Sequence, residues 1–495
     1  MNFSVLYDPV IPVIMLDGEN RELGIREALE KAHQIRGIQC SSPLEKYAMI
    51  RLLVAFSMDI LQPKRWSDRQ ELLEKGQFNP ETLDSYFSMC EKDGPRFELF
   101  DKEHPFMQAK YDEKLDGKAL KAISNISVSL PSGNNHIFLN HRPEDVSVMT
   151  PAEAFRALIA IYVFCTAGAQ GYPSGINNTP PLYAWVAGRN LYEEIILNSV
   201  AEKECAPIKY GAGEVPWRSN EPIIPKQMYE EVTMLEALTW QPRRATLVRD
   251  EDGMVRRVYF QQGKNFKGNA VWQDPHVAYR YTKSGEWFSV KPQSGRALWR
   301  DIGSMLMDAS AMKAKPPLVV AQAARVLDNE DVLLNINEVG LVTNQASYVE
   351  WLEEHLSIPA AFMEEEGMAN LLRSDVEGVE RIQSAIVSAV NKKIKNGAAL
   401  SEQARSHFLN QMHDIVFGYS IPSLLNIRCE MTEEKQLEHI IEFNRKMLKA
   451  LHNTFREVVE NSGAGSGYML AQVEAHSYAV NLFMNYKIER EGEHE

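Results

Sequence analysis

The sequence predicts an α+β protein in which a large mixed domain, residues 1–360, is followed by a four-helix bundle, residues 361–495. Three observations carry this prediction. The 495 residues are enough for two or three domains, since a domain usually holds about 100 to 200 residues. Short β-rich and helical segments alternate in the first part of the chain, whereas the last part shows only helical periodicity. Hydrophobic residues (44%) and charged residues (24%) occur in the proportions of a folded globular protein.

The mixed domain begins with two β-rich stretches within residues 3–15, broken at Pro9 and Pro12, which predict short strands or an edge hairpin. Ser42 and Thr150 each precede a proline, an arrangement typical of a helix start. Apolar residues at three- and four-residue spacing then predict helices over 25–35, 43–61 and 151–165.

A β-hairpin is predicted from two strand-like segments, 245–249 and 255–260, which flank a glycine-containing turn at 250–253. Residues 241–300, the basic segment, hold twelve Lys and Arg against five Asp and Glu, a net charge of +7, while the rest of the chain carries −21. A solvated β surface explains such charge. A nucleic-acid surface would add aromatic residues, and the segment contains Tyr259, Phe260, Phe266, Trp272, Tyr279 and Tyr281.

The C-terminal part is predicted to form four long helices joined by short connections, which is typical of antiparallel neighbours in a bundle. Apolar periodicity places these helices over 376–394, 401–416, 433–459 and 468–486. Residues 351–495 carry fourteen basic and twenty-two acidic residues, a net charge of −8. This balance favours contacts with proteins over contacts with nucleic acid.

The overall composition limits the classes of partner and cofactor. A net charge of −14 and a pI near 5.5 mean that the whole molecule repels phosphates and membrane headgroups. Any nucleic-acid site must therefore be local, and no membrane partner is expected. Five cysteines lie far apart without the spacing of a zinc site, so no metal and no cofactor are predicted. The first residues lack a signal or transit pattern, so we expect a cytoplasmic protein.

Familiar catalytic motifs do not occur in the sequence. His-Glu-x-x-His and Gly-x-Ser-x-Gly are absent, and the glycine-rich run 463–467 lacks the Lys-Ser/Thr of a phosphate-binding loop. That run lies where a helix connection is expected. We therefore expect a protein without catalytic activity, while a stand-alone enzyme with a helical lid remains an alternative.

Four unusual stretches have ordinary structural explanations when each is taken alone. Residues 104–108 could be a buried loop anchored by Phe106 and Met107, and 343–347 could begin a helix capped by Asn344. Residues 130–140 could form a simple turn. Residues 167–175 could follow a helix end, although their glycines would also permit a close backbone approach to a ligand.

Taken together and in order, these stretches resemble the CasA family, the large subunit of the type I-E CRISPR Cascade complex, an RNA-guided antiviral surveillance assembly. The resemblance extends over most of the chain. It rests on Pro9–Val13, His104–Gln108, Asn135–Asn140, Val186–Gly188, Leu197–Asn198, Trp272–His276, Asn344–Ala346 and the helical Ala404-x-x-His407-Phe408-x-x-Gln411. Some relatives also carry a cysteine cluster that could hold zinc, and this sequence has none near 241–300.

The resemblance implies a non-catalytic ribonucleoprotein subunit that recognises the protospacer-adjacent motif (PAM), a short flag in double-stranded target DNA, and starts R-loop formation. It assigns a duplex-opening wedge to Gln345, flanked by Asn344 and Ala346. It assigns a glycine loop at the minor groove to residues 168–175, with contacts from Gly168, Gly171, Ser174 and Gly175. A lysine finger in the same groove corresponds to Lys264 or Lys267.

The same resemblance implies that residues 134–147 dock on the 5′ handle of the guide RNA, with Phe138 and Asn140 at the contact positions. Its further partners are the other Cascade subunits, through the bundle, and the helicase-nuclease that degrades the target.

General physical chemistry agrees with these roles. The minor groove offers a degenerate pattern of donors and acceptors, so a glycine backbone with one Lys and one Asn can distinguish little beyond A·T from G·C. Glutamine is long enough to act as a wedge and polar enough to satisfy exposed base edges. A structural subunit that binds the guide handle without reading DNA is the main alternative.

Overall fold

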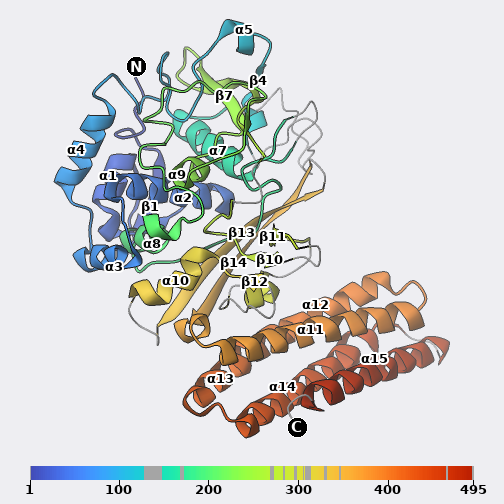
Figure 1. The fold of residues 1–495 in the computed structure, drawn as a ribbon. Helices are drawn as coiled ribbons and strands as arrows, with labels where there is room; N and C mark the ends of the chain where they lie inside the picture. Colours follow the sequence, from blue (N-terminus) through green and yellow to red (C-terminus); the bar gives the residue numbers. More distant parts are fainter. Residues whose placement is uncertain are drawn as a thin grey trace. The chain divides into compact units, whose positions relative to one another are not determined.

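A computed structural model describes residues 2–127, 148–167, 172–267, 272–281, 285–294, 298–304, 306, 314–327, 332–344, 347–463 and 466–492. Contacts divide the chain into two compact units (Figure 1). Unit 1 comprises Met1–Leu298 and Lys313–Ala360, and unit 2 comprises Trp299–Met312 and Ala361–Glu495. The predicted α+β class with a helical C-terminal part is confirmed.

Two apolar helices form the centre of unit 1. Helix α2, Pro43–Leu61, begins where the Ser42 hydroxyl accepts a hydrogen bond from the backbone amide of Glu45. Helix α7, Pro151–Phe164, begins with a capping box in which Thr150 and Glu153 each bind the other's backbone amide. Both helices are buried along most of their length and pack against each other. The helices predicted at 43–61 and 151–165 are therefore confirmed.

The first sheet of unit 1 contains β1, Ile11–Met15, between β2, Asn20–Leu23, and β3, Ile35–Ile38. The helix predicted over 25–35 is only partly correct. Helix α1 covers Ile25–Glu30, a 3-10 turn follows at Ala32–Gln34, and the chain then enters β3. The β-branched Ile35 and Ile38 are buried there and pair with β1, which favours a strand over continued helix.

The predicted hairpin in the basic segment is confirmed. Strands β7, Arg243–Arg249, and β8, Val255–Gln262, pair in antiparallel register, and β4, Leu120–Ala122, adds to the other edge of β8. Gly253 closes the turn with φ +85°, a conformation that favours glycine. Strand β9, Asn265–Phe266, continues from this hairpin and pairs in parallel with β6, Met228–Tyr229.

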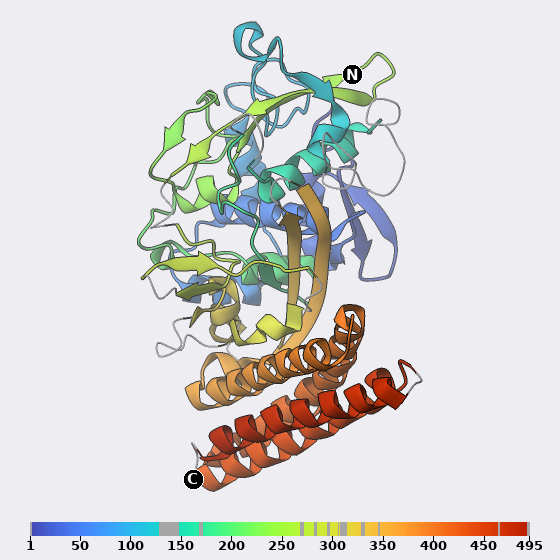
Figure 2. The same cartoon turned by 90° about the vertical axis from the view of Figure 1, so that its right-hand side faces the viewer.

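A long hairpin dominates the last part of unit 1 (Figure 2). Strand β13, Leu333–Asn344, pairs with β14, Ser347–Pro359, along its whole length and with β5, Tyr183–Val186, on its other edge. Asn344 is paired with Ser347, so the alternative that 343–347 begins a helix is wrong. The other α-helices and strands that the structure describes in unit 1 are α3 Trp66–Lys75, α4 Pro80–Cys90, α5 Glu113–Asp116, α8 Leu191–Leu197, α9 Met234–Leu238, α10 Leu318–Leu327, β10 Tyr279–Tyr281, β11 Trp287–Ser289 and β12 Ala314–Lys315.

Unit 2 is a helical bundle in which the predicted helices are confirmed, the first and last of them longer than predicted and the third ending at Thr454 in a π-helix, Phe455–Val459. They are α11 Glu366–Lys393, α12 Ala398–Ile415, α14 Glu433–Thr454 and α15 Ser466–Gly492, with a short α13, Ile421–Ile427, between α12 and α14. A buried polar layer crosses the bundle. Asp375 of α11 accepts hydrogen bonds from Arg490 of α15, from Ser420 and from His439 Nε2 of α14, the last at 3.0 Å. None of the described helices combines the length and apolar character that a membrane crossing requires.

Candidate nucleic-acid interface

The structure describes five of the residues that the family resemblance assigned to nucleic-acid contacts. Asn344, Ser174, Gly175, Lys264 and Lys267 belong to the described part of unit 1. The remaining predicted contact residues, Gln345, Ala346, Gly168, Gly171, Phe138 and Asn140, lie outside the described residues.

Asn344 is the last residue of β13, and its side chain is exposed. The hairpin behind it is firmly anchored, because Val339 and Leu341 of β13 are buried and β5 pairs with β13 on the side away from β14. Asn344 faces Ser347 across the strands at this end of the hairpin. Side chains on a long paired hairpin are held more precisely than side chains on an unsupported loop.

Ser174 and Gly175 lie in an irregular segment between α7 and β5. The Ser174 hydroxyl donates a hydrogen bond to Asn178 Oδ1 at 3.3 Å, and the Gly175 amide donates to the carbonyl of Cys165 at 3.3 Å. Ser174 is half-buried, whereas Gly175 is buried. Of these two residues, Ser174 therefore has the side chain that a ligand can reach.

The two candidate lysines have different surroundings. Lys264 Nζ lies 2.8 Å from Glu236 Oε1 and sits over the rings of Tyr229 and Trp240, and its side chain is only 14% exposed. Lys267 is exposed, and its backbone amide donates to the carbonyl of Tyr229 at 2.9 Å. Within the described ranges its ammonium has no ion-pair partner. A phosphate or base edge can therefore reach Lys267 without breaking an existing ion pair.

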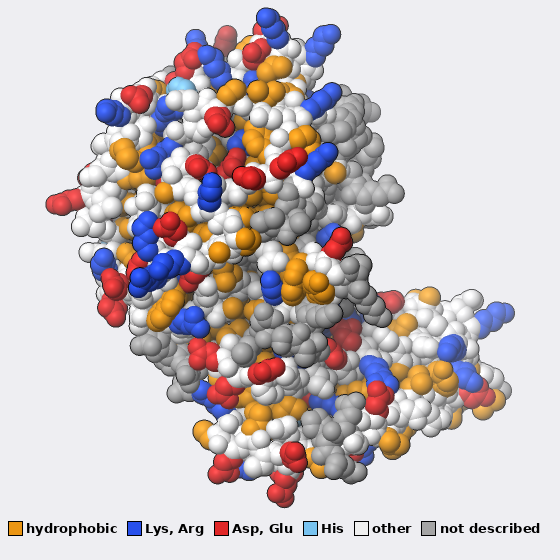
Figure 3. Space-filling view, in the orientation of Figure 1, with side chains coloured by type: hydrophobic (Ala, Val, Ile, Leu, Met, Phe, Trp, Pro, Cys, Tyr) orange, Lys and Arg blue, Asp and Glu red, His pale blue; other side chains and the backbone are white. Residues whose placement is uncertain are grey.

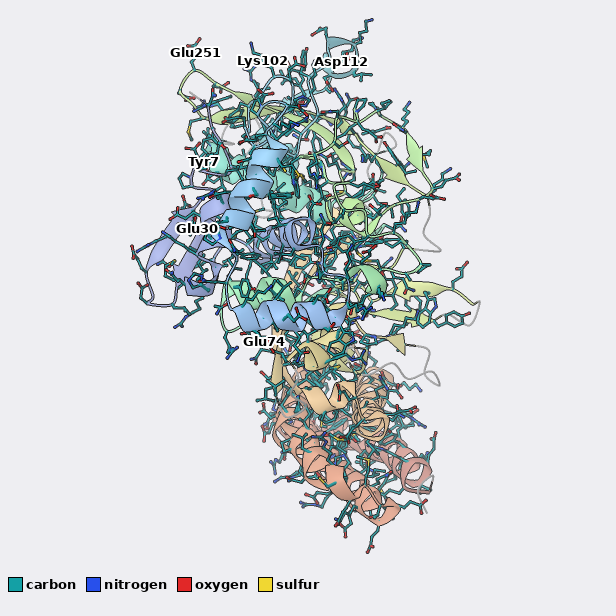
Figure 4. All side chains as sticks on the ribbon, turned by 60° about the vertical axis from the view of Figure 1, so that its left-hand side comes forward. Tyr7, Glu30, Glu74, Lys102, Asp112 and Glu251 are labelled. Carbon is teal, nitrogen blue, oxygen red and sulfur yellow. The ribbon has the colours of Figure 1, made fainter. Side chains whose placement is uncertain are left out.

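Much of the charge in the basic segment is neutralised or buried. Arg256 pairs with Asp250 at 3.0 Å and with Asp252 at 2.7 Å, and Arg257 lies 3.4 Å from Asp250. Figure 4 shows Glu251 of the same turn pointing away from unit 1. On the face shown in Figure 3, basic and acidic side chains are interspersed. That face therefore carries no uniformly positive surface among the side chains that the picture colours.

The aromatic residues of the basic segment are partly core residues. Phe260, Trp272 and Tyr279 are buried. Tyr259, Phe266 and Tyr281 are half-buried, and the Tyr259 ring packs against that of Tyr111. Of the six aromatics that the sequence analysis named, these three buried ones are unavailable for stacking on bases, and their contribution is to packing.

The motif 272–276 forms a buried polar network that sequence reasoning did not resolve. Arg51 of α2 binds both carboxylate oxygens of Asp274, with Nη1 to Oδ1 at 3.1 Å and Nη2 to Oδ2 at 2.8 Å. Asn177 accepts from Trp272 Nε1 at 2.6 Å and donates to Asp274 at 2.8 Å. The network therefore ties the segment that carries Ser174 and Gly175 to the chain that follows Lys267.

His276 belongs to the same network as a neutral ring. Its Nε2 lies 3.1 Å from the carbonyl of Asn198, so Nε2 carries the proton, and Nδ1 can accept from Arg51. Burial lowers the pKa of His276 to about 4. Asn198, which also belongs to the motifs of the family resemblance, holds β5 in place. Its Oδ1 accepts from the amide of Val186, and its Nδ2 donates to the carbonyl of Val186. These motif residues are therefore structural supports of unit 1.

The motif 104–108 is confirmed as a packing loop. Phe106 and Met107 are buried, and Phe106 contacts the rings of Phe56 and Trp217. The loop lines a cavity of about 320 Å³ together with Arg96, Glu236 and Lys264. Among the residues that the structure describes, no group of three or more His, Cys, Asp or Glu side chains could hold a metal ion.

Comparison with known proteins decides the family. The model of the family "CRISPR-associated protein Cse1" matches residues 5–471, nearly the whole chain. The chain belongs to the Cse1 family. The CasA resemblance in the sequence is thereby confirmed, since CasA and Cse1 name the same protein in a relative from Thermus thermophilus. That relative is 27% identical over 417 residues, which are 82% of this chain and 80% of the relative.

Solved structures show the Cse1 fold over the full length. The crystal structure of Cse1 from Acidimicrobium ferrooxidans has a TM-score of 0.75 at 20% identity and covers 99% of both chains. A chain of a structure described as a "CRISPR RNA-guided surveillance complex" has a TM-score of 0.76 at 18% identity and covers 97% of this chain and 99% of its own length.

The last Cse1-like motif in the sequence, Ala404 to Gln411, lies within α12 of the bundle. Ala404 and Phe408 are buried. Gln411 Nε2 lies 3.0 Å from His407 Nδ1 and donates to Thr454 Oγ1 at 3.2 Å. This motif therefore joins α12 to α14, and its role in unit 2 is structural.

Proposed function

We propose that this Cse1-family chain is the large, non-catalytic subunit of a CRISPR RNA-guided surveillance complex and that it opens target DNA beside the PAM. Membership of the family supports the assignment to the complex. The observation that supports the DNA-opening role is the hairpin of β13 and β14, an anchored element whose strands end at Asn344 and begin at Ser347, on either side of the proposed wedge.

Gln345 is the proposed wedge, with Asn344 and Ala346 beside it. Opening one base step costs a few kcal/mol, and pairing of the guide then replaces DNA pairing at nearly balanced free energy. A small free-energy contribution from the protein at the first base pair is therefore sufficient to start strand separation. The amide of glutamine can bond to the base edges that strand separation exposes, which an apolar side chain could not do.

The PAM is proposed to be read from the minor groove by the segment 168–175 and by one lysine. Lys267 is the better candidate for the lysine finger, because Lys264 is held by Glu236 inside unit 1 whereas Lys267 is exposed. Ser174 offers a half-buried hydroxyl, and Gly168 and Gly171 would allow the backbone to approach the groove. Such contacts distinguish A·T from G·C but little more, so loose PAM specificity follows.

The remaining partners belong to the same proposal. Phe138 and Asn140 would contact the 5′ handle of the guide RNA. The acidic balance of residues 351–495 supports contacts of the bundle with other protein subunits of the complex. The subunit would also help to recruit the helicase-nuclease, and the whole assembly would act in the cytoplasm.

Reconstituted surveillance complex tests the proposal by R-loop formation on a PAM-bearing duplex at one fixed salt concentration, because salt alone can change affinity about a thousandfold. Gln345→Ala should open the duplex much more slowly, and a target that is already melted beside the PAM should restore the rate. Gln77→Ala is the matched control, since Gln77 is an exposed glutamine of unit 1 between α3 and α4, outside the segments proposed to contact DNA. Equal opening by wild type and Gln345→Ala would leave a structural subunit that binds the guide handle without reading DNA.

A further inference from the structure

Arg243 of β7 is a buried arginine whose guanidinium joins two separate parts of the chain. Its Nη2 donates to the carbonyl of Thr166 at 2.7 Å, and its Nη1 donates to the carbonyl of Pro173. Thr166 follows α7, and Pro173 belongs to the segment Tyr172–Gly175. The guanidinium also lies over the Tyr172 ring, 5.1 Å from its centre. One side chain therefore fixes this segment at the end of α7.

The same residue is fixed against the strand that leads to the lysines. Arg243 pairs with Gln262 at the end of the hairpin of β7 and β8. Gly263 follows at such close range that an added Cβ would lie 2.6 Å from backbone atoms of Arg243. The amide of Lys264 then donates to the carbonyl of Gln241 at 3.0 Å. Arg243 thus holds a constant spacing between the segment Tyr172–Gly175 and the chain that carries Lys264 and Lys267.

The hydrogen-bond partners of Arg243 differ from those of Arg51 and of its neighbour Arg244. Arg51 faces the carboxylate of Asp274, and Arg244 faces that of Asp116. The partners that the structure describes for the Arg243 guanidinium are carbonyl groups, those of Thr166, Pro173 and Pro242. A buried charge is costly without a counter-ion. A buried arginine at position 243 is explained if its function is to hold the carbonyl groups of Thr166 and Pro173 together.

We propose that Arg243 is a positioning residue for PAM reading, which it controls by holding Tyr172–Gly175 at a fixed spacing from Lys267 without touching DNA. This inference rests on the proposed function of that segment. Lysine at position 243 would keep the positive charge, but a single ammonium cannot reproduce the planar fork that spans Thr166 and Pro173. Sequence preference at the PAM should then weaken, while duplex opening as such should remain.

The test compares Arg243→Lys with Arg244→Lys in reconstituted complex. Arg244 is the matched control, because it is the adjacent residue, is equally buried, and directs its guanidinium to Asp116 and to the carbonyls of Lys110 and Ile223. The probe is a library of target duplexes with a randomised PAM. The readout, the preference ratio, is the rate of R-loop formation on the fastest PAM sequence divided by the mean rate over all PAM sequences. A target that is already melted beside the PAM is used in parallel, because its R-loop rate does not depend on PAM recognition.

Arg243→Lys should reduce the preference ratio by about tenfold, the effect of losing one charge-assisted hydrogen bond, while the melted target opens at the wild-type rate. Arg244→Lys should keep the wild-type ratio, even if its thermal unfolding midpoint falls. An unchanged ratio in Arg243→Lys, or an equal loss in both variants, would overturn the positioning role.

Two further results are decisive. If Arg243→Lys does not assemble, Arg243→Gln replaces it, because an uncharged amide can donate to one carbonyl group but cannot bridge those of Thr166 and Pro173. A wild-type ratio in Arg243→Gln would then overturn the inference. If the wild-type complex itself shows no preference among flags, PAM reading is wrong for this chain, and the role of Arg243 falls with it.

Discussion

Arg51 and Asp274, 223 positions apart in the sequence, form a two-point ion pair in the interior of unit 1, with side chains only 3% and 0% exposed. The guanidinium belongs to α2, and the carboxylate belongs to the segment that follows the basic strands. The Arg51 guanidinium holds the pKa of Asp274 below its usual range despite burial, which by itself would raise that pKa. The pair thus joins the central helix of unit 1 to the chain beside the proposed DNA-reading segment.

Replacing Asp274 with asparagine should destabilise unit 1 by about 3 to 5 kcal/mol, because the Arg51 charge would remain buried without a counter-ion. Urea unfolding followed by tryptophan fluorescence measures the change. Asp252→Asn is the control, since Asp252 pairs with Arg256 at the surface and its loss should leave the midpoint unchanged. A wild-type midpoint for Asp274→Asn would show that the ion pair adds nothing to stability.

Glu194 of α8 should give stability a dependence on pH. Burial raises its pKa to about 7, although Trp185 Nε1 donates to Oε1 at 2.7 Å and favours the charged form. The folded protein therefore holds a proton that the unfolded chain releases, and stability falls as pH rises from about 4.5 to 7. Glu194→Gln keeps an acceptor for Trp185 and removes the titration.

We therefore expect Glu194→Gln to be more stable than wild type at pH 8 by up to about 3 kcal/mol, since a pKa change of one is worth about 1.4 kcal/mol. At pH 4.5 and below, the two proteins should be alike. Urea midpoints at pH 4.5 and pH 8 measure the difference, with the exposed Glu202→Gln as control. If Glu194→Gln and wild type differed in stability by the same amount at pH 4.5 and at pH 8, titration of a buried Glu194 carboxyl would be contradicted.

Lys267 and Lys264 should differ in how salt affects DNA binding. Lys267→Ala removes an exposed charge, so it should weaken duplex binding by the complex and reduce the slope of log K against log salt by about 1. Lys264→Ala removes a charge already paired with Glu236, so it should lower the unfolding midpoint and leave the slope unchanged. Binding titrations at several salt concentrations measure both. A reduced slope in Lys264→Ala alone would assign the finger to Lys264.

The polar layer of unit 2 should be essential to the bundle. Asp375→Asn leaves the guanidinium of Arg490, 5% exposed, without its carboxylate partner and should destabilise the bundle by about 3 to 5 kcal/mol. Hydrogen exchange of the amides in α11 and α15 measures this loss locally. Glu489→Gln, which removes the exposed partner of Arg381, is the control and should leave exchange unchanged. Unaltered protection in Asp375→Asn would rule out a stabilising role for the layer.

Local sequence was sufficient to predict several elements of the fold. Ser42 and Thr150, each before a proline, fixed the starts of α2 and α7, because a helix cap depends on residues within one turn. The hairpin of β7 and β8 followed from alternating segments around a glycine turn. The end of α1 was missed, because Ile35 and Ile38 join a sheet whose partner strand, β1, lies about twenty residues earlier.

The sequence by itself thus determined the fold class, the bundle and the Cse1-family membership, since these depend on periodicity and on an ordered set of motifs. It could not separate Lys264 from Lys267, nor find Arg243 and Asn177 among the polar residues of unit 1. Tertiary structure decided these points, because a charge is free or neutralised according to residues that only folding brings near it. Glu236 holds Lys264, and two distant carbonyl groups hold Arg243.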